Sequence, residues 1–163
     1  MRFYRIILLA AVLAAGCSGG EAPAGRKAPD FALNSPRGAS LHLQAAEAGG
    51  PVLVVFWSVY CGACRYMVPL LNALQDKYGG KGLSVIAVSI ADPAADVAEY
   101  GSRNGLKYPL ALDGDGAVAR LYGVRGTPTS ILVDKDGTIR KTWVGYSPAM
   151  DSELDTILPA MMK

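Results

Sequence analysis

The feature that most constrains this chain is a pair of cysteines, Cys61 and Cys64, placed directly after a continuous hydrophobic run. The run, residues 52–58, is β-branched and aromatic, which is typical of a strand covered on both faces. Residues 62–78 then carry apolar side chains at helical spacing and end at two glycines, a helix stop. A Cys-x-x-Cys at such a junction puts the first thiol at a helix N-terminus, where unpaired N–H groups favour its thiolate.

This placement predicts different roles for the two thiols. We expect Cys61 to be the exposed attacking thiolate and Cys64 the more buried thiol that resolves the mixed disulfide. The alternatives are half of a zinc site and a purely structural disulfide. Zinc needs two further ligands, and beyond the pair the sequence offers only His42, with no second Cys-x-x-Cys. We therefore expect no metal and no cofactor other than the redox-active Cys61–Cys64 disulfide.

The remaining pattern predicts one α/β domain, for which 163 residues are enough. A short hairpin strand is expected around residues 41–43. Beyond the cysteines, strands are expected over residues 83–90, 108–112, 130–133 and 138–144, and helices over residues 94–103, 117–122 and 147–161. This order predicts a mixed central β-sheet with helices on both faces.

The N-terminus is typical of an export signal. A basic start is followed by an apolar stretch, residues 6–15, which is too short to span a membrane as a helix. Residues 13–17 resemble a bacterial lipobox, whose cysteine, here Cys17, is lipid-modified; the alternative is an ordinary secretory peptide with an accidental cysteine. We expect residues 1–16 to be removed, 17–27 to be a lipid-anchored flexible tether and 28–163 to fold.

Charge and compartment narrow the function further. Without Arg2 and Arg5, which lie in the expected signal, basic and acidic residues balance, so nothing indicates nucleic-acid binding. The expected location is the cell envelope, on the periplasmic side of a bacterial membrane. Because exported compartments are oxidising, the Cys61–Cys64 pair is either a disulfide for donation or a dithiol kept reduced by a dedicated electron supply.

Residues 56–65, Phe-Trp-Ser-Val-Tyr-Cys-Gly-Ala-Cys-Arg, look like the active-site segment of thioredoxin-like proteins. The wider pattern is similar to the TlpA/ResA branch of exported, membrane-attached thiol–disulfide oxidoreductases. Three features match: the Ala-Pro-Asp-Phe opening at 28–31, shared with the AhpC/TSA-redoxin group; Pro69, which kinks the active-site helix; and Gly-Thr-Pro-Thr at 126–129. The resemblance covers residues 28–160 and implies a thioredoxin-like fold with an extra N-terminal hairpin and a central βα insertion.

The resemblance also implies a site and partners. In the family, the bond before Pro128 is cis and lies against the cysteines, which leaves the backbone of Thr127 free to pair with a bound peptide. The residues that shape the site would be Trp57, Tyr60, Gly62 and Ala63. The substrates would be protein thiols and disulfides, such as apocytochrome c, and a reductant would need a membrane electron-transfer partner of DsbD or CcdA type. We expect a monomer.

Three positions depart from the family pattern. Tyr60 replaces the usual Trp before the first cysteine. Val55 stands where thioredoxins carry a buried Asp, and Met67 stands where the TlpA/ResA branch often has a Glu. Both carboxylates that could take the proton of Cys64 are thus replaced, which leaves the direction of electron flow open, with reductase favoured by the branch and oxidase or isomerase as alternatives.

Two functions of other classes remain. The Ala-Pro-Asp-Phe opening at 28–31 suggests a thiol peroxidase as one alternative. Peroxiredoxins need a Thr three residues before the peroxidatic cysteine, and here Ser58 stands at that spacing from Cys61. A copper- or haem-handling chaperone that uses the thiols as ligands is another. The scarcity of histidine and the expected cis-proline count against the chaperone.

Overall fold

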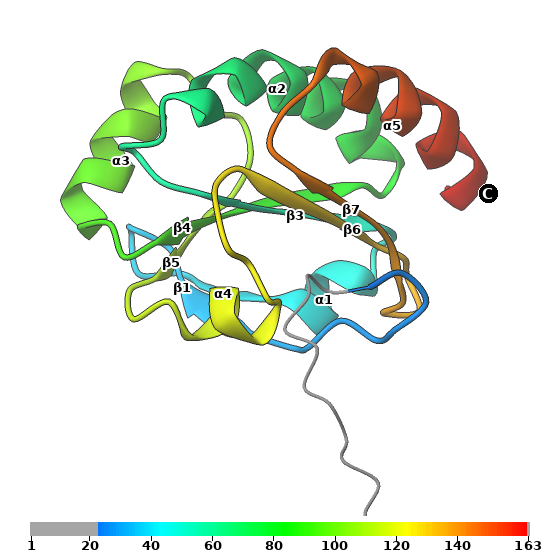
Figure 1. Ribbon diagram of the computed structural model, residues 1–163, viewed down its shortest axis with the longest axis horizontal. Coiled ribbons are helices and arrows are strands. Elements are labelled where there is room, and N and C mark those ends of the chain that lie inside the picture. Colours follow the sequence, from blue (N-terminus) through cyan, green and yellow to red (C-terminus); the bar gives the residue numbers. More distant parts are fainter. Residues whose placement is uncertain (1–22, 163) are drawn as a thin grey trace, which may run out of the picture.

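In the computed structural model, which describes residues 23–162, seven strands form one mixed sheet with helices on both faces (Figure 1). The order across the sheet is β2-β1-β5-β4-β3-β6-β7. β3, β4 and β5 are parallel, whereas β6, β7 and the β1–β2 hairpin run antiparallel to their neighbours. The strands are β1 (Ala32–Asn34), β2 (Ser40–His42), β3 (Val52–Trp57), β4 (Ser84–Ile90), β5 (Leu110–Asp113), β6 (Thr129–Val133) and β7 (Ile139–Val144).

The helices form a layer on each side of this sheet. The longer ones lie together above it in Figure 1, and two short ones lie below. The upper layer holds α2 (Val68–Tyr78), α3 (Ala94–Arg103) and α5 (Pro148–Met161), and the lower layer holds α1 (Leu43–Glu47) and α4 (Ala117–Leu121). Two 3-10 segments, η1 (Ala63–Met67) and η2 (Gly79–Lys81), flank α2.

β3 is the central strand of the core, and all six of its residues are buried. Because successive side chains point to opposite faces, Leu53, Val55 and Trp57 pack in the cluster beneath α2, α3 and α5. The alternate residues pack in the cluster on the other face, with α1 and α4. Burying both faces of one strand fixes its position, so the segment that follows Trp57 starts from a rigid point.

The predicted fold class is confirmed, including the N-terminal hairpin and the βα insertion formed by β5 and α4. The helix expected over 62–78 is divided into η1 and α2, and Pro69 is the reason. Pro69 has no N–H to donate to the carbonyl of Arg65, so it is tolerated in the first turn of α2 but not inside one continuous α-helix. The short α1 was not expected.

The folded part begins before residue 28. The backbone N–H of Gly25 donates to Ile139 O, and that of Ile139 donates to Arg26 O, both at 2.8 Å. Lys27 forms a bridge with Thr138, so residues 25–27 are attached to β7 rather than forming part of a tether. The expected signal and Cys17 lie outside the described residues. Within residues 23–162, no helix is long and apolar enough to cross a membrane.

Candidate active site

The two cysteines form a disulfide where β3 gives way to η1. Their sulfurs are 2.15 Å apart and their Cα atoms 5.3 Å apart. Cys61 is partly exposed, whereas Cys64 is 6% exposed. The backbone N–H of Cys64 donates to Cys61 Sγ at 3.1 Å. The structure therefore has a partly exposed Cys61 whose sulfur receives an N–H at the start of a helix, and a buried Cys64 that follows it.

A buried carboxylate, Asp92, holds the loop that leads to Cys61. Asp92 follows β4 and accepts three hydrogen bonds: from Ser58 Oγ at 2.8 Å, from the Val59 N–H at 3.0 Å and from Ser89 Oγ at 2.5 Å. Ser58 Oγ in turn accepts the N–H of Tyr60 at 3.2 Å. Charge-assisted bonds of this kind are roughly twice as strong as neutral ones, so the loop is tied to the end of the neighbouring strand.

Sequence reasoning missed Asp92. It lies 34 positions after Ser58, and only the pairing of β3 with β4 brings the two residues together. A signal was present, since the carboxyl ends of neighbouring parallel strands meet at one edge of a sheet, where functional groups collect. Reading the residues after 83–90 against those after 52–58 would have put Asp92 beside the loop.

A second carboxylate, Asp96 on α3, receives the side chain of Tyr60. The Tyr60 hydroxyl donates to Asp96 Oδ2 at 2.9 Å, while the ring remains 76% exposed. The hydrogen bond to Asp96 and the charge of that carboxylate raise the pKa of Tyr60. Tyr60 therefore directs its hydroxyl to α3, and its ring forms an exposed aromatic surface next to Cys61.

Behind Cys64 the surroundings are apolar. The Trp57 ring is buried and packs on Tyr100, with 5.1 Å between ring centroids. Val55 and Met67, at the two positions where carboxylates were missing, are both buried here. Burial also raises the pKa of Tyr100 and of Tyr108, so both phenols stay protonated in the physiological range.

The Thr127–Pro128 peptide bond is cis. Pro128 is buried and comes directly before β6, whose Thr129 pairs with Phe56 at the end of β3. The carbonyl of Pro128 accepts the N–H of Gly145 at 2.8 Å. The sheet thus brings the proline segment to the edge at which the cysteine loop begins.

The minor sequence candidates lie elsewhere. His42 is exposed on β2, and its Nε2 is 2.9 Å from Ser40 Oγ. Gly62 and Ala63 are exposed between the cysteines. In the part of the chain that the structure describes, no three His, Cys, Asp or Glu side chains gather as a metal would require.

Comparison with known proteins gives the chain its family. The Redoxin family model matches residues 23–158. The chain is 32% identical to the thiol-disulfide oxidoreductase ResA of Geobacillus thermodenitrificans over 137 residues, covering 83% of this chain and 78% of the relative. It is 35% identical over 124 residues to the ResA of Halalkalibacterium halodurans, covering 76% of this chain and 70% of the relative.

A solved structure with a similar fold leads to the same family. A putative thiol:disulfide interchange protein DsbE from Chlorobium tepidum superimposes with a TM-score of 0.80 at 35% identity, covering 86% of this chain and 99% of that one. The chain belongs to the redoxin family of the thioredoxin superfamily, in its TlpA/ResA-like branch, and is a thiol–disulfide oxidoreductase.

Proposed function

We propose that this protein is an exported, lipid-anchored reductase of protein disulfides on the periplasmic side of a bacterial membrane. The observation that carries the proposal is the contrast within the pair: Cys61 is accessible and receives the Cys64 N–H, whereas Cys64 is 6% exposed directly behind it. Such a pair can attack with one sulfur and resolve with the other.

The reaction takes two steps. The Cys61 thiolate attacks one sulfur of a substrate disulfide, and the other substrate sulfur leaves as a thiolate that takes up a proton. Cys64 then loses its proton and attacks Cys61 Sγ, which releases the second substrate thiolate and forms the Cys61–Cys64 disulfide. Two electrons pass from the dithiol to the substrate, and a membrane partner of DsbD or CcdA type would return the protein to the dithiol.

The remaining elements of the proposal come from the sequence. The signal-like residues 1–16 and the lipobox-like residues 13–17 support export and anchoring through Cys17. The resemblance to the TlpA/ResA branch supports the reductive direction and substrates such as apocytochrome c. Trp57, Tyr60, Thr127 and Pro128 would shape the surface on which a substrate polypeptide lies.

An insulin-reduction assay with the protein lacking residues 1–22, combined with a redox titration, tests this function. The wild type is expected to accelerate reduction, and Cys61→Ser to abolish it. Cys64→Ser is expected to accumulate a mixed disulfide through Cys61, visible by mass spectrometry. Full activity in Cys61→Ser, or no turnover in the wild type, would contradict the proposal.

The structure gives an argument against the peroxidase alternative. The hydroxyl of Ser58 donates to Asp92 at 2.8 Å, so its hydrogen is already used and is not free to polarise a peroxide next to Cys61. We therefore expect no peroxide consumption above that of a simple dithiol.

A further inference from the structure

A small cavity lies directly behind the resolving cysteine. Its volume is about 10 Å³, which is the room that one water molecule needs. Cys64 and Trp57 line it, together with the apolar side chains of Val55 and Met67. The cavity therefore occupies the place from which the missing carboxylates would have acted on Cys64.

Trp57, one of the residues that line this cavity, carries a hydrogen-bond donor without an acceptor. Trp57 is 5% exposed, and its Nε1–H finds no partner among residues 23–162. Buried N–H groups in native proteins are almost always paired, either with protein or with an ordered water. The cavity has room for one water molecule, and a water there would be the acceptor that the Trp57 Nε1–H lacks within residues 23–162.

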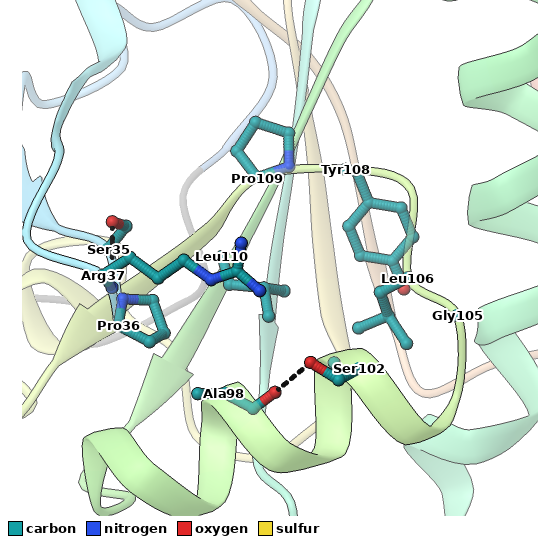
Figure 2. A pocket seen from close by; sticks show the side chains of 11 residues that line it. Ser35, Pro36, Arg37, Ala98, Ser102, Gly105, Leu106, Tyr108, Pro109 and Leu110 are labelled. Carbon is teal, nitrogen blue, oxygen red and sulfur yellow. Dashed lines mark hydrogen bonds between the residues drawn. The ribbon is translucent and has the colours of Figure 1, made fainter.

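The cavity also lies next to solvent. Leu106 and Tyr108 line both the cavity and a larger open hollow of about 460 Å³ between α3, the β1–β2 turn and the segment before β5. Figure 2 shows the two side chains next to each other on that segment, at the side of the hollow. Leu106 and Tyr108 thus stand between the space behind Cys64 and the open hollow.

The resolving step requires a path by which a proton leaves Cys64. Cys64 must give up its proton before its sulfur attacks Cys61, yet the residue is only 6% exposed to solvent. Val55 and Met67 supply no base. Tyr100 and Tyr108 stay protonated because burial raises the pKa of each, so neither phenol is a base at neutral pH.

We propose that a water molecule bound in this cavity, and held by the Trp57 Nε1–H, takes the Cys64 proton and passes a proton past Leu106 and Tyr108 to the hollow. The inference rests on the proposed role of Cys64 as the resolving thiol. In the resolving step the Cys64 S–H bond breaks, its proton moves into this water, and the sulfur forms its bond to Cys61 as the substrate thiolate leaves. Trp57 is a positioning residue in this step.

The water itself can be detected in the oxidised wild type, independently of any activity. In ¹⁵N-labelled protein, magnetisation transfer from water to the Trp57 indole proton should reveal a long-lived bound molecule. The other indole, Trp143, donates to Glu153 at 2.6 Å and provides the comparison within the same spectrum. If Trp57 shows no such contact with water, the inference is overturned.

Kinetics test the function of this water. The resolving step is followed by stopped flow from a preformed mixed disulfide at Cys61, between pH 6 and 10. Trp57→Phe keeps an aromatic ring but removes the donor, so the pH midpoint of this step should rise by about one unit and the rate below it fall about tenfold. Trp143→Phe should leave the rate and midpoint unchanged.

A second substitution distinguishes a defect in proton transfer from a defect in folding. In the Trp57→Phe background, Met67→Glu puts a carboxylate on the cavity wall and should restore at least half of the lost rate, whereas the similarly sized Met67→Gln should not. Urea unfolding of each variant establishes that the compared proteins are folded. If Trp57→Phe resolves like the wild type while Cys61→Ser is inactive, the proposed function stands and this inference fails; if Cys61→Ser is active, the proposed function fails first.

Discussion

The two sides of the disulfide differ in what surrounds them. On the Cys61 side, Asp92 and Asp96 fix the preceding loop through the Ser58 and Tyr60 hydroxyls and the N–H of Val59. On the Cys64 side, the neighbours are Val55, Met67 and buried aromatic rings, with no carboxylate lining the cavity. The acids of this site therefore position the attacking sulfur and are not available to deprotonate the resolving one.

The largest expected effect is a difference in thiol reactivity. In the reduced protein at pH 7, iodoacetamide should alkylate Cys61 about a hundredfold faster than Cys64, because Cys61 lies at a helix start and is accessible while Cys64 is buried in apolar surroundings. Peptide mass spectrometry of timed samples measures both rates. Equal alkylation rates would show that the different burial of Cys61 and Cys64 does not make their thiols differ in reactivity.

Removing Asp92 should loosen the Cys61 side. Asp92→Ala leaves two hydroxyls and one N–H without their acceptor, and we expect it to lower the free energy of unfolding by about 3 kcal/mol. Urea denaturation of the oxidised protein measures this. Asp76→Ala is the matched control, because Asp76 makes an exposed ion pair with Lys107 and its loss should cost less than about 1 kcal/mol.

Ser58 should have a smaller effect that depends on Asp92. Ser58→Ala removes the bond to the carboxylate and the acceptor of the Tyr60 N–H. We expect a loss of about 1.5 kcal/mol in the wild type and a smaller loss in the Asp92→Ala background, where only the bond to Tyr60 remains to be lost. Ser102→Ala, on the exposed face of α3, should change stability by no more than about 0.5 kcal/mol. If the losses for Ser58→Ala and Asp92→Ala simply add, the hydrogen bond between Ser58 and Asp92 does not stabilise the loop.

The smallest effect concerns two tyrosines whose pKa values are raised for different reasons. The hydrogen bond to Asp96 raises the pKa of Tyr60, whereas burial raises that of Tyr108. Both contribute stability that is complete below the unfolded pKa of about 10 and is lost as the pH rises through the folded values.

Asp96→Ala should therefore lower the pKa of Tyr60 and leave that of Tyr108 unchanged. Ultraviolet difference titration measures the change, with Tyr60→Phe used to assign the signal. A parallel shift of both phenols would show that Asp96 acts on the whole site rather than on Tyr60.

The features that could be predicted from the sequence are those that depend on residues close together in the chain. The continuous run of β3 and the spacing of Cys61 and Cys64 are local patterns, and the structure has both as expected. The division of the active-site helix was readable in part, since Pro69 alone breaks the hydrogen-bond series. The five-residue α1 was not, because so short a segment shows no helical period.

What the sequence could not give depends on contacts across the sheet. In the sequence nothing distinguishes Asp92 from the other acidic residues, of which the chain has 14 in all. Its position next to Ser58 follows only from the pairing of β4 with β3. The attachment of Gly25 to β7 is made by backbone groups, which carry no side-chain signal, so the start of the domain was set too late. The unpaired Trp57 N–H likewise emerges only after the core has been packed.

The attachment of residues 25–27 to β7 also determines where a force on the N-terminal side of the domain would act. These residues join the sheet beside the β6–β7 turn, level with the start of β3, whereas Cys61 follows the other end of that strand. Six strand residues separate the two ends, a span of roughly 20 Å. A force applied through residues 25–27 would therefore act on the edge strand β7 at the end of the sheet opposite to the disulfide.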